Sequence, residues 1–194
     1  MKKIAVFCGA SIGFNPVYAK AAKDLGIFLA RKNIEIIFGG GKFGMMGALA
    51  DAALQEGGTV TGVIPDFLKV VEIEHTGVQK MITSKNMADR KMIISKTVDG
   101  YIALPGGFGT LDELMEALTL GQLQIEHKPV GILNINGFFD PLIVQFDLMV
   151  KEGFLKPENH NMVLVSDKIE KLFEMMQNYE APKVSKLVHT VASK

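Results

Sequence analysis

The sequence has little cysteine, no excess of either charge and few long apolar runs. Its 194 residues include a single cysteine, Cys8, so no disulfide can form within the chain, and we expect a cytoplasmic location. The 21 basic and 21 acidic side chains cancel, which ranks nucleic acid and membrane surfaces low as partners. The apolar stretch at residues 4–10 is too short to span a bilayer and lacks a secretory cleavage signature.

Metal-ligand clusters and domain linkers are also missing from the sequence. The four histidines are scattered, and no group of His, Cys, Asp and Glu has metal-ligand spacing, so we expect no required metal and no cofactor. No Pro/Ser/Gly-rich linker or charge block divides the chain. We therefore expect one domain over residues 1–180, followed by a flexible tail at 181–194.

What the chain does contain is a regular alternation of short apolar runs and helical patterns. The runs are continuous rather than alternating, as in parallel strands that are covered on both faces. The expected strands are residues 4–8, 34–38, 59–64, 100–104 and 130–133, with 78–82 as a further candidate. The expected helices are roughly 16–31, 44–56, 85–96, 110–126, 138–151 and 167–178. This order predicts an α/β fold with a doubly wound parallel sheet, whose ligands bind beyond the carboxyl ends of the strands.

Glycine-rich turns follow the first and second expected strands. Residues 9–13 read G-A-S-I-G, the nucleophile-elbow pattern, but the histidines downstream, at 75, 127, 160 and 189, give no pattern-level support for the acid and histidine that a serine hydrolase also needs, so we interpret these residues as a ligand-facing turn. Residues 39–47 read G-G-G-K-F-G-M-M-G and include the dinucleotide fingerprint G-x-G-x-x-G. An NAD(P)-dependent oxidoreductase is therefore one alternative, although the fingerprint follows the second strand and Asp66 lies in an irregular loop. We interpret Lys42 as a solvated turn residue.

A third turn, residues 105–113, reads P-G-G-F-G-T-L-D-E and opens a helix. Glycines leave backbone N–H groups unobstructed, and the positive end of the helix dipole favours an anion. A phosphate bound at the loop of residues 106–110, which begins with Gly106, would accept bonds from the N–H groups of 107–110 and from the Thr110 hydroxyl. Thr110 and Glu113 also have the spacing of a capping box, which would satisfy the free donors of the helix. The spacing leaves both interpretations open.

A pair of cations precedes the third turn. Met87, Arg90, Lys91 and Ile94 fall on one helix face, so the two cations share that face with apolar neighbours. A cation at the edge of the core needs a carboxylate or a phosphate as its partner. The alternative is that Arg90 extends over its own stem into solvent.

Together, these segments resemble the Lonely Guy (LOG) family of cytokinin riboside 5′-monophosphate phosphoribohydrolases. The family marker P-G-G-x-G-T-x-x-E matches residues 105–113 without departure, M-x-x-R-K matches residues 87–91, and the similarity runs from about residue 3 to 175. One departure is Ala88, where many relatives have His, which puts base preference or rate in doubt. An older label for some members, lysine decarboxylase, has no support here, because nothing marks a pyridoxal-binding lysine.

The resemblance implies a Rossmann-like fold, a homodimer, and hydrolysis of the N-glycosidic bond of cytokinin riboside 5′-monophosphates or AMP to a free base and ribose 5-phosphate. A non-catalytic nucleotide-binding protein is the second alternative. Arg90 and Glu113 match the essential pair of the family and are the catalytic candidates, which also contact substrate. The other matched nucleotide-contacting positions are Glu72, Lys91, Gly107, Phe108, Gly109, Thr110, Leu111, Asp112 and Thr119. The apolar residues Phe138, Phe139, Phe146, Met149 and Phe154 serve either core packing or the dimer contact.

Overall fold

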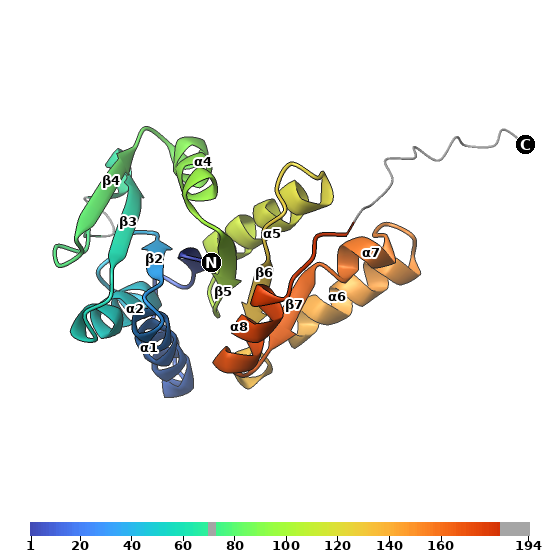
Figure 1. Cartoon of the computed structure of the whole chain (residues 1–194), viewed down its shortest axis with the longest axis horizontal. Helices are drawn as coiled ribbons and strands as arrows, with labels where there is room; N and C mark the ends of the chain where they lie inside the picture. The colour runs from blue at the N-terminus through green and yellow to red at the C-terminus, as the bar shows by residue number, and fades with distance from the viewer. Residues whose placement is uncertain (70–72, 183–194) are drawn as a thin grey trace, which may run out of the picture.

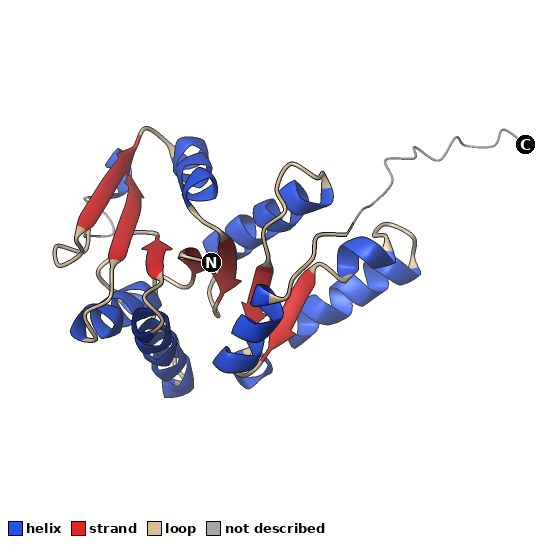
Figure 2. Cartoon of the chain, in the orientation of Figure 1, coloured by secondary structure: helices blue, strands red, loops and turns tan. Residues whose placement is uncertain are grey.

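The computed structural model describes residues 1–69 and 73–182. Within these residues a 7-stranded parallel sheet runs through the molecule in the order β4-β3-β2-β1-β5-β6-β7, with helices on both faces (Figure 1, Figure 2). The strands are β1 (Lys3–Phe7), β2 (Glu35–Phe38), β3 (Val60–Pro65), β4 (Lys80–Ser84), β5 (Gly100–Ala103), β6 (Val130–Leu133) and β7 (Val163–Ser166). The predicted α/β fold with a doubly wound, Rossmann-like parallel sheet is confirmed.

The helices divide between the two faces of the sheet. The elements are α1 (Pro16–Arg31), α2 (Gly44–Gln55), η1 (Asp66–Leu68), α4 (Met87–Thr97), α5 (Phe108–Gln122), η2 (Ile135–Gly137), α6 (Asp140–Lys151), α7 (Pro157–His160) and α8 (Ile169–Gln177). The apolar faces of α1, α2 and α8 form one core cluster with the strands, and those of α4, α5 and α6 form the other. Each helix layer therefore excludes water from one face of the sheet.

Strand β1 illustrates how the sequence builds both cores. Ile4 and Val6 point into the cluster under α1 and α2, whereas Ala5 and Phe7 point into the cluster under α4 and α5. Successive side chains of a strand alternate between its faces, so a continuous apolar run is buried on both sides. Each fully buried aliphatic side chain contributes roughly 1.5–3 kcal/mol through its removal from water. This burial places β1 in the middle of the sheet.

One strand and one α-helix were not expected from the sequence. β7 and α7 lie in residues 157–166, where neither a strand nor a helix was expected, and β4 begins two residues later than its candidate run. Most of the expected tail, residues 183–194, lies outside the described residues. Pro182 still contacts the domain, because its carbonyl oxygen accepts a hydrogen bond from Gln124 Nε2 at 3.1 Å. In the described part of the chain, no helix combines the length and apolarity needed to span a membrane.

The strand order creates a crevice between β1 and β5. After β1 the chain adds β2, β3 and β4 to one side, and then returns to add β5, β6 and β7 to the other. Loops at the carboxyl ends of β1 and β5 therefore diverge, and such a switch point is where doubly wound folds bind ligands. The two loops are still joined, since Gly9 N donates to Pro105 O at 3.1 Å.

Candidate active site

A cavity of about 510 Å³ opens at the carboxyl ends of β1 and β5. This volume lies within the usual range of small-molecule sites. The turn after β1 contributes Cys8, Gly9, Ala10, Ser11 and Gly13 to its wall, and the turn after β5 contributes Pro105, Gly106, Gly107, Gly109 and Thr110. Arg90 of α4 and Glu113 of α5 complete the polar part of the lining.

The N-terminus of α5 faces this cavity. The helix begins at Phe108 with Gly107 as its N-cap, so Thr110 lies inside the first turn and is buried. The capping-box interpretation is therefore wrong, because the helix starts before Thr110 and its cap is a residue without a side chain. The first intrahelical bond runs from Leu111 N to Gly107 O at 3.1 Å. The N–H groups of residues 107–110 precede it and remain available for an anion.

Glycines are needed in this loop for two different reasons. A Cβ atom on Gly106 would lie 2.1 Å from Thr110 Oγ1 and 2.8 Å from Gly9 N, so only glycine lets the loop approach the β1 turn this closely. A Cβ atom on Gly107 or Gly109 would meet nothing within 4 Å. Both of these glycines line the cavity, and the space beside them is open to a ligand.

Arg90 and Glu113 form a buried ion pair in the wall of the cavity. Arg90 Nη2 lies 3.4 Å from Glu113 Oε1, and the two side chains are 8% and 11% exposed. Arg90 therefore does not extend into solvent, and that alternative is wrong. Its Nη1 contacts Met87 Sδ at 3.9 Å, while its buried Nε has no hydrogen-bond partner among the described residues. An unpaired buried donor in a cavity wall is suited to a ligand that accepts a hydrogen bond.

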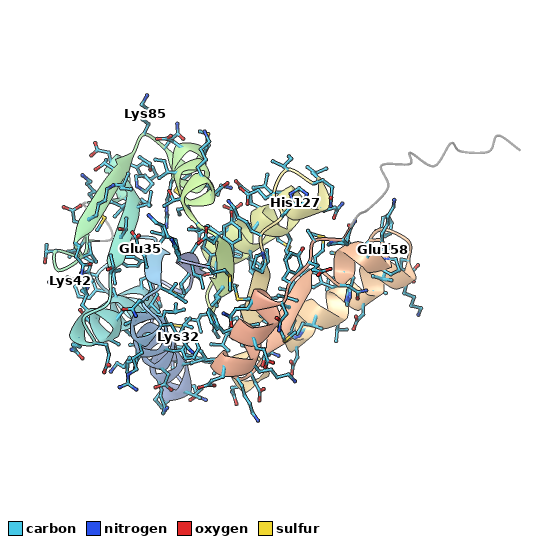
Figure 3. The ribbon with its side chains drawn as sticks, in the orientation of Figure 1. Lys32, Glu35, Lys42, Lys85, His127 and Glu158 are labelled. Carbon is cyan, nitrogen blue, oxygen red and sulfur yellow. The ribbon has the colours of Figure 1, made fainter. Side chains whose placement is uncertain are left out.

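The second glycine-rich turn makes room for this guanidinium. A Cβ atom on Gly39 would lie 2.4 Å from Arg90 Nη2, and one on Gly44 would lie 2.0 Å from Ala10 O. The glycines of the dinucleotide fingerprint thus allow contact with the protein itself, which favours a structural role for this turn over pyrophosphate binding. Lys42 is exposed at the tip of the turn (Figure 3), which agrees with its interpretation as a solvated residue.

A cysteine or serine nucleophile does not fit the geometry of the cavity. Burial, and then the charge of nearby Glu113, raise the pKa of the Cys8 thiol well above its usual value, so Cys8 stays protonated. Ser11 lines the cavity, but no histidine among the described residues lies in the wall with it. His75 instead pairs with Asp51 at 3.0 Å. These contacts support the ligand-facing interpretation of the first turn. Across residues 1–69 and 73–182, no group of three or more His, Cys, Asp and Glu side chains is arranged to hold a metal.

The structure brings half of the predicted site residues together at the cavity. Those that line it are Arg90, Gly106, Gly107, Gly109, Thr110 and Glu113. Lys91 is bound to Asp112 outside the cavity wall, at 3.1 Å, and Leu111 packs against the core under α4 and α5. Phe108 is exposed beside the loop, Thr119 is exposed about three turns further along α5, and Glu72 lies outside the described residues. The nucleotide contacts of these residues stay predictions.

Apolar residues of the cavity were missed by reasoning from motifs. They are Tyr18, Met45, Met46 and Phe138, together with Val6. Met45 and Met46 lie within the second glycine-rich turn, between Gly44 and Gly47, so their position in that motif was an available signal. Phe138 had none, because its edge-to-face contact with the Tyr18 ring, at 5.7 Å, joins segments 120 residues apart. The apolar residues expected either in the core or at a dimer contact differ in exposure, because Phe139 and Phe146 are buried whereas Phe154 is exposed.

The fold and this site define a class of protein: a Rossmann-like α/β domain with a helix N-terminus and a buried Arg–Glu pair in the cavity at its switch point. A family model described as "Possible lysine decarboxylase" matches residues 46–176. The chain is 40% identical to the probable cytokinin riboside 5′-monophosphate phosphoribohydrolase LOGL1 of Oryza sativa subsp. japonica, over 91% of this chain and 79% of that protein. It is 39% identical to the phosphoribohydrolase LOG1 of Arabidopsis thaliana, over 92% and 84% of the two chains. The chain belongs to the LOG family.

Solved structures agree with the fold. A molybdenum cofactor binding protein from Rippkaea orientalis aligns with a TM-score of 0.68 and 25% identity, over 90% of this chain and 94% of that one. The molybdenum cofactor carrier protein of Chlamydomonas reinhardtii aligns with a TM-score of 0.68 and 20% identity, over 90% and 95% of the two chains. These likenesses support the fold assignment alone.

Proposed function

We propose that this protein hydrolyses the N-glycosidic bond of an adenine nucleoside 5′-monophosphate, either AMP or a cytokinin riboside 5′-monophosphate, to the free base and ribose 5-phosphate. The observation that carries the proposal is the buried Arg90–Glu113 pair beside the free N–H groups that open α5, in one cavity. The names of the plant relatives, which are phosphoribohydrolases, support the same substrate class. A cytoplasmic location and a homodimer remain part of this proposal.

The proposed mechanism follows from the order of groups along the cavity. The 5′-phosphate binds the N–H groups of residues 107–110 and the Thr110 hydroxyl, so the ribose extends toward Glu113, one helical turn further on. Breakage of the C1′–N9 bond builds positive charge on the ribose, as in other glycosidic cleavage. The Glu113 carboxylate stabilises this charge and orients the water whose oxygen bonds to C1′. The base leaves with the bonding electron pair and gains a proton at a ring nitrogen, which balances the proton that the water loses when its oxygen bonds to C1′.

Arg90 has two roles in this mechanism. Its Nη2 holds the carboxylate of Glu113, which keeps the oxygen atoms of that group directed at the cavity. Its Nε lacks a partner in the described residues and donates a hydrogen bond to a ligand oxygen or nitrogen when the site is filled. Oriented charges in a water-poor site are among the largest contributions to catalysis.

One assay tests the proposal against its alternatives. The purified protein is incubated with AMP, isopentenyladenosine monophosphate and the two matching nucleosides, and the free base is measured by chromatography. We expect base from the monophosphates, and release from the nucleosides at least about a hundredfold slower, because remote phosphate binding contributes to catalysis at the sugar. AMP binding without base release would instead indicate a non-catalytic binding protein. Reduction of NAD(P) with an added substrate would indicate the oxidoreductase.

A further inference from the structure

The Arg90–Glu113 pair joins two helices that rest on different parts of the sheet. α4 packs on β3 and β4, whereas α5 packs on β1, β5 and β6. α4 buries only two of its own side chains, Arg90 and Ile94, so apolar packing holds it weakly. The 3.4 Å contact between Arg90 and Glu113 therefore depends on how α4 is held against α5.

Lys91, the next residue on α4, connects the two helices directly. Its Nζ lies 3.1 Å from Asp112 Oδ2 and forms a closer ion pair with Glu116. Asp112 and Glu116 are one turn apart on α5 and stand on either side of Glu113 in the sequence. We call these three side chains the Lys91 clamp. The hydrogen bond with Glu116 contributes most to raising the pKa of Lys91, so its ammonium group is charged at neutral pH.

The Lys91 clamp lies outside the substrate cavity. Neither Lys91 nor its two carboxylate partners line the 510 Å³ cavity. Lys91 and Glu116 instead line a much smaller cavity on the other side of Glu113, together with Ile94 and Tyr101. The Lys91 side chain is 19% exposed, and its ammonium donors are directed at the two carboxylates of α5. The ion pairs compete with any phosphate for the same donors.

We propose that Lys91 is a positioning residue: the Lys91 clamp holds α4 against α5 and so keeps Arg90 beside Glu113. The inference rests on the proposed function and deepens it. It also differs from the role that family resemblance implies for Lys91, which is direct contact with the nucleotide. A displacement of about 1 Å in a catalytic group can reduce turnover as much as a hundredfold, so loss of the clamp acts on kcat.

The two roles of Lys91 make opposite predictions when its partners are changed. The double variant Asp112→Asn/Glu116→Gln keeps the ammonium group and removes the carboxylates that hold it. A positioning role requires that this variant lose activity in the same way as Lys91→Met. A nucleotide-contacting role requires that the freed lysine bind AMP at least as tightly as before and that kcat stay unchanged.

The experiment measures kcat and KM for AMP in wild type, Lys91→Met, Asp112→Asn/Glu116→Gln and the matched control Lys96→Met. Lys96 is exposed on the same helix, so its variant removes an equal charge away from the clamp. We expect kcat to fall about ten- to a hundredfold in both clamp variants, with KM within about twofold of wild type and the control unchanged. A rise in KM for Lys91→Met alone, with normal kcat in the carboxylate variant, would overturn the proposal.

A second measurement is independent of turnover. Amide hydrogen exchange of ligand-free protein reports how firmly residues 87–97 are held. We expect faster exchange over α4 in both clamp variants and wild-type exchange in Lys96→Met; equal exchange in all proteins would contradict a clamp. If Lys91→Met does not fold, the single variants Asp112→Asn and Glu116→Gln decide, because these carboxylates are more exposed. Wild-type protein that releases no base refutes the proposed function, whereas the exchange data still decide the clamp.

Discussion

Two buried carboxylates, Glu113 and Glu126, lie at opposite ends of the space between α4, α5 and the sheet, and their surroundings differ in hydrogen bonding. Glu113 faces the cavity at the carboxyl ends of β1 and β5, where its partner is Arg90. Glu126 lies toward the amino ends of β5 and β6, after α5 and just before β6 begins. Both side chains are almost equally buried, at 11% and 12% exposure. The difference between them lies in how completely the surrounding donors are satisfied.

The Glu126 cluster, formed by Ser95, Tyr101, Glu126 and Lys128, is fully bonded. Glu126 accepts hydrogen bonds from the Ser95 hydroxyl, from Tyr101 Oη at 2.6 Å and from Lys128 Nζ at 3.2 Å. Burial, followed by the bond to Glu126, raises the pKa of Tyr101 well above its usual value, so its hydroxyl remains a donor. A network in which each group has a partner rigidifies a structure.

The Arg90–Glu113 pair leaves a polar atom unused. Arg90 Nε is buried and unpaired among the described residues, which costs about 1–3 kcal/mol relative to a bonded donor. Such a cost is retained where a ligand supplies the missing partner. The comparison teaches that burial of charge does not by itself point to a functional site, and that the incomplete bonding of Arg90 beside a cavity is what supports the proposed one.

The largest expected effect is that of Glu113→Gln. Because glutamine has the same shape but no charge, it can neither stabilise a cationic ribose nor accept a proton from water, and kcat should fall at least about a hundredfold. The thermal midpoint should shift little, since the side chain borders a cavity. Base release from AMP and thermal unfolding measure the two. Wild-type turnover by this variant would remove Glu113 from the chemistry.

The second prediction displaces Arg90 without removing it. In Gly39→Ala, the added Cβ would come within 2.4 Å of Arg90 Nη2 and 2.8 Å of Met46 Sδ. Both are ends of flexible side chains, so the protein should fold while the guanidinium moves away from Glu113. We expect kcat to fall about tenfold or more. A crystal structure of the variant measures the movement. If Arg90 moves and the rate does not change, its orientation of Glu113 is not needed.

Much of the fold was predictable because its strands are buried on both faces. Continuous apolar runs marked five strands, and the Asn15 cap followed by Pro16 fits the expected start of α1 at residue 16. The strand β7 was missed because Val163 to Val165 are only half-buried at the sheet edge, where a short run gives little signal. A strand in the middle of the sheet is easier to recognise than one at its margin.

The site was predictable where chemistry and spacing coincide. The motif at residues 105–113 located a loop that lines the cavity, but periodicity could not decide between a capping box and a carboxylate directed at the cavity, because Thr110 and Glu113 fit both. The decision depends on where α5 starts, which the packing of Gly106 against Thr110 sets. Arg90 and Lys91 were likewise placed on one helix face, so periodicity could not distinguish their roles. The contacts in the structure do distinguish them, because Arg90 lines the cavity whereas Lys91 pairs with a carboxylate of α5.

The third prediction concerns the satisfied cluster. Glu126→Ala removes the acceptor shared by Ser95, Tyr101 and Lys128 and should lower the free energy of unfolding by about 2 kcal/mol. The kcat for AMP, measured well below the thermal midpoint, should stay near wild type, because the cluster does not line the cavity. Urea unfolding measures the stability. Glu152→Ala, an exposed glutamate, is the control and should change it by less than about 0.5 kcal/mol. A large loss of kcat would show that the two carboxylates are coupled.

The smallest expected effect is a pH dependence of stability that originates at Glu126. Burial acts to raise the pKa of this carboxyl, but the hydrogen bonds from Ser95, Tyr101 and Lys128 outweigh it, so the net shift is downward. A carboxyl whose pKa is lower in the folded state stabilises the fold above its usual pKa of 4.5, and this contribution is lost as the pH falls through the folded value. Glu126→Gln cannot titrate, so the difference in unfolding free energy between wild type and this variant should be constant near pH 7 and shrink as the solution is acidified below pH 4.5. Urea titrations at several pH values measure it. A difference that does not change with pH would mean that the cluster stabilises the protein through shape and neutral hydrogen bonds, and not through the charge that distinguishes it from an ordinary polar contact.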